Sequence, residues 1–103
     1  QREQSFEAKY KRDQETLFRI TSRRNRLLGL WVAEQLGMPD NQALDYAKEV
    51  VLSDFEEPGD EDVVRKVLKD FEDRGIDMDE ASLRAEMLRL MDEAGRQIDS
   101  ENS

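Results

Sequence analysis

The chain has 103 residues, of which 40% are charged and 37% hydrophobic, and its formal net charge is −9. This length suits a single domain with a modest core, and the composition is typical of a helical bundle. Because the sequence contains neither cysteine nor histidine, it excludes disulfides, thiolate nucleophiles, the usual zinc and haem sites, and catalytic arrangements built on histidine.

The charge is unevenly distributed along the chain. Residues 1–30 contain eight Lys and Arg against four acids, a net charge of +4, so the remaining 73 residues carry −13. This division predicts a basic arm on an acidic body. An acidic body repels phosphate, so we expect the arm to bind an acidic protein groove rather than nucleic acid. The alternative is that these charges only solvate helix faces.

Residues 3–36 contain no proline and one glycine, which predicts one long helix. Its N-terminal part carries a narrow apolar stripe, whose members lie within about 60° on a helical wheel. They include Phe6, Tyr10 and Leu17. A narrow stripe holds a helix weakly on its own core and suits a groove on another protein. We therefore expect residues 1–22 to form a mobile or extended arm. The alternative is that Phe6 and Tyr10 pack on the chain's own bundle.

The C-terminal part of this long helix, residues 23–36, is expected to enter the core. Residues 27–32 are apolar on almost every side of a helix, so they must be covered on every side. The only tryptophan, Trp31, lies in this run. Gly29 costs up to about 1 kcal/mol inside a helix, and we expect it to permit close approach of a second helix. Gly37 is a fitting residue to end the helix.

A second helix is predicted over residues 41–56, with Asp40 or Asn41 as its N-cap. Its expected core residues are Leu44, Ala47, Val50, Val51 and Phe55, with Tyr46 on the flank.

A third helix is predicted over residues 61–74, where acids at the start complement the helix dipole and Gly75 follows the end. Its expected core residues are Val63, Val64, Val67, Leu68 and Phe71. The acids before this helix resemble a calcium-binding loop only superficially. Pro58 takes the fifth position, and Arg65 replaces the glutamate required at the twelfth. We therefore expect no metal site.

A fourth helix is predicted over residues 80–99, capped by Asp79 directly or by Asp77 together with Glu80. Its apolar residues have the most regular helical spacing in the chain. They are Leu83, Met87, Leu90, Met91, Ala94 and Ile98. The predicted fold is therefore an all-α four-helix bundle with a long first helix. Residues 1–22 form the arm and residues 23–103 the body.

No catalytic constellation is visible in the sequence. With 25 acids in the chain, no carboxylate pair is specific, and there is no glycine-rich phosphate loop. Arg23, Arg24 and Arg26 could contact a phosphate, but ion pairing with the chain's own acids at the bundle surface is the favoured interpretation. We expect neither catalysis nor a cofactor.

The sequence also bears on location. No apolar run approaches the ~20 residues of a membrane span, and the first 26 residues lack the apolar region of a signal peptide. The chain starts at Gln1 without a methionine, as a processed protein or a fragment of a longer product would. We expect a cytoplasmic protein without membrane insertion.

Four stretches resemble the zeta-subunit family, a group of small alphaproteobacterial proteins named for an inhibitor of the F-type ATP synthase. They are residues 6–10 (FEAKY), 24–31 (RNRLLGLW), 46–51 (YAKEVV) and 54–63 (DFEEPGDEDV). The order and spacing also agree with the family, and the resemblance extends over residues 2–98.

The resemblance implies a four-helix protein whose N-terminal segment is inhibitory. In the family this segment is thought to enter the catalytic interface between the α and β subunits of the ATPase head, near γ, and to block rotation in the hydrolysis direction. On this chain the segment corresponds to about residues 1–18. The implied partner-binding residues are Arg2, Phe6, Lys9, Tyr10, Arg12 and Leu17.

The resemblance further implies a monomer when free, peripheral on the ATP synthase at the inner membrane. Two other functions stay open at this point. One is a general protein-interaction module whose basic arm binds another acidic partner. The other is a nucleotide or phosphate binder that uses Arg23, Arg24 and Arg26.

Overall fold

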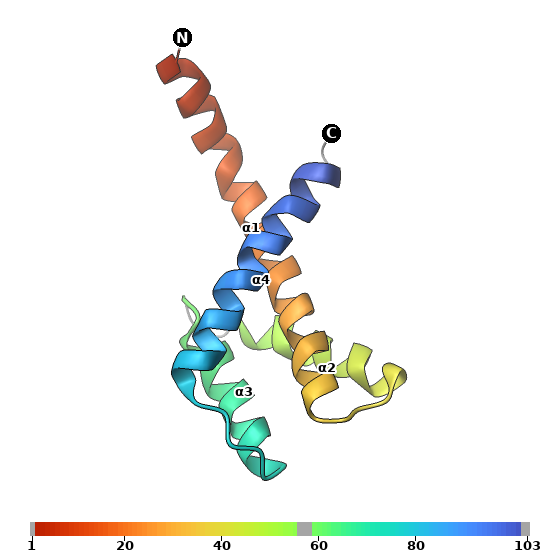
Figure 1. The fold of residues 1–103 in the computed structure, drawn as a ribbon. Coiled ribbons are helices and arrows are strands. Elements are labelled where there is room, and N and C mark those ends of the chain that lie inside the picture. The colour runs from red at the N-terminus through yellow and green to blue at the C-terminus, as the bar shows by residue number, and fades with distance from the viewer. Residues whose placement is uncertain (1, 56–58, 102–103) are drawn as a thin grey trace.

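The computed structural model describes residues 2–55 and 59–101, and within these ranges it describes side chains from residue 14 onward. It contains four α-helices, α1 (Arg2–Gln35), α2 (Asp40–Ser53), α3 (Glu61–Asp73) and α4 (Glu80–Glu101) (Figure 1). No strand occurs within those ranges. The prediction of an all-α, four-helix protein with a long first helix is therefore confirmed. None of the helices in the described part is long and apolar enough to cross a membrane.

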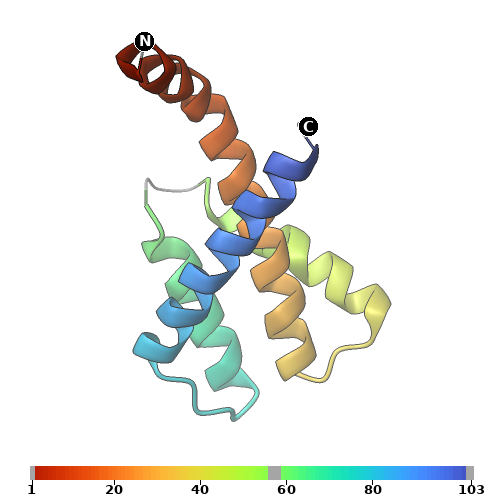
Figure 2. The ribbon, with the colours of Figure 1, turned by 45° about the horizontal axis from the view of Figure 1, so that its top comes forward.

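The long helix α1 organises the other three. It packs against α2 and α4, while α3 packs against α2 and α4. Figures 1 and 2 show α4 crossing α1 near its middle, and the N-terminal half of α1 projecting beyond the other helices. The molecule is accordingly elongated, with extents of 54 × 25 × 22 Å.

Glycine ends two of the helices, as predicted. Gly37 has a φ of +75°, a conformation that glycine adopts without a Cβ penalty. Its N–H donates to the Glu34 carbonyl at 3.1 Å, and the N–H of Met38 donates to the Ala33 carbonyl at 2.9 Å. These two bonds form a Schellman motif. Gly75 ends α3 with the same pair of bonds.

The helix starts match the predictions at α4 but not at α2. The Asp79 carboxylate accepts hydrogen bonds from the Ser82 N–H at 3.0 Å and the Ser82 hydroxyl at 2.7 Å, so Asp79 caps α4 directly. At α2 the expected cap was wrong. Pro39 occupies the N-cap position, and Asp40 is the first helical residue. Pro39 has the extended backbone angles of an N-cap residue, and no side chain caps the helix there. The helix therefore starts one residue earlier than it would with Asp40 as its N-cap.

The end of α2 also differs from the prediction, because this helix stops at Ser53 rather than at residue 56. The Asp54 N–H donates to the Val51 carbonyl at 3.3 Å, and the Phe55 N–H donates to the Leu52 carbonyl at 3.1 Å. Both bonds span three residues, the spacing of a 3₁₀ turn that tightens a helix end.

The core lies where all four helices meet. Its buried apolar residues are Leu28, Val32, Ala33, Leu36, Tyr46, Val50, Val63, Val64, Val67, Phe71, Leu83, Met87 and Leu90. Within the apolar run of α1, Leu28 and Val32 are fully buried, whereas Leu27, Leu30 and Trp31 are half-buried. Trp31 meets Phe71 edge-on, with ring centroids 6.4 Å apart. The run is thus central to the core, but it is not covered on every side.

The faces of α3 and α4 are as predicted, whereas the prediction for α2 is confirmed at Ala47 and Val50 but wrong at Leu44 and Phe55. Tyr46, Ala47 and Val50 are buried, while Leu44 is 49% exposed and Phe55 is 60% exposed. Tyr46 can be buried because its hydroxyl donates to Asp70 of α3 at 2.6 Å. The covered face of α2 is therefore rotated toward Tyr46 and away from Leu44 and Phe55.

Gly29 explains how α1 and α2 approach so closely. A Cβ added to Gly29 would lie 2.5 Å from the Ala47 Cα and 3.1 Å from the Ala47 Cβ. Only glycine fits this crossing without displacing backbone. The prediction of a close helix approach at Gly29 is confirmed.

Candidate partner-binding surface

The helical backbone of α1 is continuous across the expected boundary between arm and body at residue 22. Along one helix, residues spaced by four and seven positions share a side, so the backbone places Phe6, Tyr10 and Leu17 on a common side of α1. Of the predicted partner-binding residues, only Leu17 has a described side chain. The others lie outside the described side chains and stay predictions, namely Arg2, Phe6, Lys9, Tyr10 and Arg12.

Leu17 is 53% exposed and adjoins a second exposed apolar side chain, Phe18, at 57%. Phe18 contacts Phe55, which follows α2, with ring centroids 6.0 Å apart and the rings tilted by 47°. Leu52, one turn before Phe55, is 65% exposed. These four residues, which we call the base patch, leave large apolar side chains accessible where the projecting half of α1 meets the body.

Sequence reasoning found only part of the base patch. Leu17 lies on the predicted stripe, but Phe18 falls outside it, and Phe55 was expected in the core. The sequence does contain one signal of the patch. The apolar residues of α2 spread over an arc that is too wide for the neighbouring helices to cover completely.

A polar contact joins α1 to α4 close to the base patch, on another side of α1. Nη1 of Arg23 is 2.8 Å from Oε1 of Gln97 and 2.7 Å from Oε2 of Glu101, both on α4. Nη2 of Arg19 is 3.8 Å from Oε1 of Glu101. The neighbouring guanidinium of Arg23 holds the pKa of the Glu101 carboxyl below its ordinary value. Pairing of the arginines with the chain's own acids, the favoured interpretation, is thus observed for Arg23.

Arg24 also pairs within the chain, but its own side chain is buried while that of its partner Asp60 is 44% exposed. The residue is 3% exposed, and Nη2 donates to Oδ1 of Asp60 at 2.7 Å while Nη1 donates to Oδ2 at 3.4 Å. Its Nε donates to Oδ1 of Asn25, which is also buried, at 2.8 Å. The expectation of a surface position was wrong for Arg24. Its forked guanidinium finds a two-point partner at the start of α3, which compensates for burial.

Next to Arg24 is a hollow of about 180 Å³. Its lining residues are Arg24, Asp60, Arg84, Met87, Leu88 and Met91. Arg84 pairs with Glu61 and Glu80, just as Arg24 pairs with Asp60. Because carboxylates already accept from both guanidiniums, the hollow offers little to a phosphate, and the phosphate-binding alternative gains no support. No group of three or more carboxylates in the described part is arranged to hold a metal ion.

Comparison with known proteins agrees with this fold. The family model described as "ATPase inhibitor subunit zeta" matches residues 1–97. A solved structure, described as a solution NMR structure, is 49% identical in sequence and covers 82% of this chain and 95% of its own, with a TM-score of 0.73. No curated protein matched the sequence.

Proposed function

Because the chain belongs to the ATPase inhibitor subunit zeta family, we propose that it is a regulatory subunit that inhibits ATP hydrolysis by the F-type ATP synthase. Membership of an inhibitor-subunit family implies a regulatory rather than a catalytic role and association with that enzyme. We assign inhibition to the arm, residues 1–22, which contains the N-terminal half of α1. This segment would enter the catalytic interface of the α and β subunits, near γ.

The observation behind this assignment is that α1 is much longer than the part of it that packs in the core. The helix has 34 residues, which at ~1.5 Å per residue makes it ~50 Å long. Among its described side chains, which start at residue 14, the first buried apolar residue is Leu28, so the turns from residue 14 to residue 23 add no fully buried apolar side chain to the core. A helix that projects beyond its bundle, with apolar side chains exposed on it, is suited to a groove on another protein (Figure 2).

The charges support the same assignment. The N-terminal third is basic and the rest of the chain strongly acidic. Lys9 and Arg12 would face acidic side chains of the groove, while Phe6, Tyr10 and Leu17 would enter it. A helix held between α and β opposes the rearrangement of that interface which each rotation of γ requires. Inhibition would then arise from obstruction, and the chain would need no chemistry of its own.

The proposal is tested by following ATP hydrolysis by the purified ATPase head. The full chain is expected to inhibit at micromolar concentrations or below. A chain lacking residues 1–16 is expected not to inhibit while keeping the circular dichroism of the folded body. Absence of inhibition by the full chain would contradict the proposal, as would full inhibition by the truncated one.

A matched pair of point variants refines this test. Leu17→Ser is expected to raise the half-inhibiting concentration roughly tenfold, the loss typical of an apolar anchor in an interface. Leu88→Ser is the control, because Leu88 is also a large exposed apolar residue, at 74%, but belongs to α4 rather than to α1. Equal effects of the two substitutions would argue against a specific contact at Leu17.

A further inference from the structure

Arg23 connects the projecting half of α1 to two consecutive turns of α4. Its Nη1 reaches Oε1 of Gln97 at 2.8 Å and Oε2 of Glu101 at 2.7 Å. Residues four apart lie on the same side of a helix, so one guanidinium bridges the last described turn of α4 and the turn before it. A cation near the C-terminal end of a helix also interacts favourably with the helix dipole.

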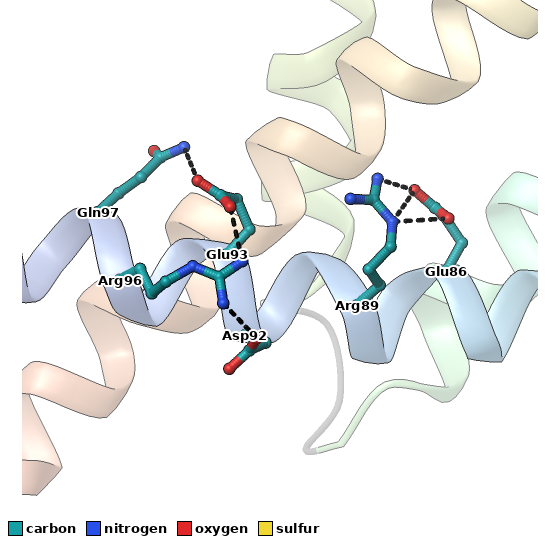
Figure 3. Close-up of polar contacts among 6 residues, drawn as sticks. All are labelled: Glu86, Arg89, Asp92, Glu93, Arg96 and Gln97. Carbon is teal, nitrogen blue, oxygen red and sulfur yellow. Dashed lines mark hydrogen bonds and ion pairs between the residues drawn. The ribbon is translucent and has the colours of Figure 1, made fainter.

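The side chain of Gln97 is itself held in orientation by α4. Its Nε2 donates to Oε2 of Glu93 at 3.2 Å, and Oε1 of Glu93 accepts from Arg96 at 2.8 Å (Figure 3). Arg96 in turn donates to Asp92 at 2.6 Å. Because the amide NH₂ is engaged by Glu93, the amide oxygen is directed to Arg23. Side chains over two turns of α4 therefore fix the acceptor that Arg23 meets.

A second contact supports α1 from another direction. Phe18 packs on Phe55, with ring centroids 6.0 Å apart. Phe18 and Arg23 are five residues apart, which places them roughly 140° apart around the helix axis. Contacts on two sides of one helix restrict the direction of its axis, whereas a contact on a single side leaves it free to pivot.

We propose that Arg23, Gln97 and Glu101 form a brace that sets the direction in which the N-terminal half of α1 leaves the body. Arg23 is then a positioning residue, since it acts on the partner through the segment that it orients. The importance of the brace for inhibition rests on the proposed function. The inference adds that the last turns of α4, distant in sequence from the inhibitory segment, take part in its presentation.

The exposure of these residues separates the brace from the core. The Arg23 side chain is 24% exposed and that of Glu101 is 45% exposed. Ion pairs at this exposure contribute little to folding stability. Their loss is therefore expected to alter the direction of α1 while the thermal unfolding midpoint stays nearly constant.

Spin labels measure that direction without any partner. Since the chain contains no cysteine, Gln14→Cys and Lys48→Cys create two unique labelling sites. The first is an exposed position on the projecting half of α1, and the second is an exposed position on α2. Double electron–electron resonance is expected to give a narrow distance distribution in the labelled parent. It is expected to broaden in Arg23→Gln and in Glu101→Gln. The broadening in the double variant should be less than the sum of the two single effects, because both substitutions break the contact between Arg23 and Glu101.

The control is Arg89→Gln. Arg89 pairs with Glu86 one turn away on α4, so this change removes a comparable ion pair within that helix (Figure 3). It is expected to leave the distribution unchanged. An unchanged distribution in Arg23→Gln, or broadening in Arg89→Gln equal to that in Arg23→Gln, would overturn the brace.

Inhibition of the ATPase head tests the consequence. Each single brace variant is expected to raise the half-inhibiting concentration about 2- to 5-fold, the range that one exposed ion pair supplies, and the double variant should raise it by less than the product of the two single effects. Broadened distances with unchanged inhibition would overturn the positioning role. If the unmodified chain did not inhibit at all, the proposed function would fail, and the distance measurements would still decide whether the brace exists.

Discussion

At the scale of single residues, Gly29 sets the distance between α1 and α2. The atom that an added Cβ would strike is the Ala47 Cα, which belongs to the backbone of α2 and cannot rotate away as a side chain would. Gly95 lies in the interior of α4, where an added Cβ meets nothing within 4 Å. Position 29 therefore requires a glycine, whereas position 95 has room for a side chain.

We predict that Gly29→Ala destabilises the protein by about 1–3 kcal/mol, because the helices must separate to relieve the overlap. We predict that Gly95→Ala stabilises it by about 0.5–1 kcal/mol, the gain from replacing glycine inside a helix. Urea unfolding followed by circular dichroism measures both changes. A stabilising effect of Gly29→Ala would contradict the packing described for α1 and α2.

A second residue-scale prediction concerns Asp79. The hydroxyl and the N–H of Ser82 donate to its carboxylate and lower its pKa from the ordinary value of 3.8. A pKa that is lower in the folded state stabilises the protein above the unfolded value and loses this contribution as pH falls through the folded value. We therefore expect an NMR titration of Asp79 to have a midpoint below 3.8. In Ser82→Ala the midpoint should return toward that value, and an unshifted midpoint in the parent would contradict the cap.

At the scale of helices, the buried faces of α3 and α4 could be predicted from the sequence and that of α2 only in part, for a physical reason. In α4 the apolar residues fall in one arc, so only one orientation buries them. In α2 they spread from Tyr46 round to Phe55, and the periodicity alone cannot tell which part of that arc is covered. The crossing at Gly29 and Ala47 and the hydrogen bond from Tyr46 to Asp70 decide it.

The same limit applies to the polar contacts of the candidate site. That Arg23 and Arg24 pair with acids was foreseeable, since 21 acids follow residue 30. Which acids they meet was not. Arg23 meets Glu101 only because α4 runs back across α1, and Arg24 meets Asp60 only because α3 starts beside it. Burial of Arg24 depends on that tertiary contact and leaves no mark on the local sequence.

The orientation of α2 yields a prediction at this scale. Val50→Ala removes a fully buried side chain and is expected to cost roughly 2 kcal/mol. Leu44→Ser changes a residue that is 49% exposed and is expected to alter the free energy of unfolding by about 0.5 kcal/mol or less. Thermal or urea unfolding compares the two. A loss from Leu44→Ser as large as that from Val50→Ala would mean that Leu44 lies in the core, as the sequence pattern predicted.

At the scale of the whole molecule, the charge is distributed unevenly over an elongated shape. The basic third of the chain lies on α1, and the acidic helices α2 and α3 lie at the end of the molecule opposite the N-terminus, while α4 crosses α1 (Figure 1). A charge division of this kind orients a protein as it approaches an acidic groove, and the apolar contacts then form at close range.

We therefore predict that inhibition of the ATPase head depends on salt mainly through its rate of onset. Raising the ionic strength from ~0.05 M to ~0.3 M shortens the screening length from ~14 Å to ~6 Å and should slow association several-fold. The rate of recovery after dilution should change little, because apolar contacts such as that of Leu17 resist screening. Stopped-flow measurement of the loss of hydrolysis gives the first rate, and dilution gives the second. An onset independent of salt would contradict a role for the basic arm in approach.

Site-specific photocrosslinking during inhibition tests most directly whether the N-terminal half of α1 is the inhibitory element. A benzophenone side chain is introduced at Leu17 in one variant and at Leu88 in another, and each is mixed with the ATPase head and ATP under conditions in which hydrolysis is inhibited. If the N-terminal half of α1 is the inhibitory element, position 17 is expected to crosslink to the α or β subunit, and position 88 is expected to give no crosslink within the catalytic interface. An inhibited head that crosslinks to position 88 within that interface, but not to position 17, would contradict the claim that the N-terminal half of α1 is the inhibitory element.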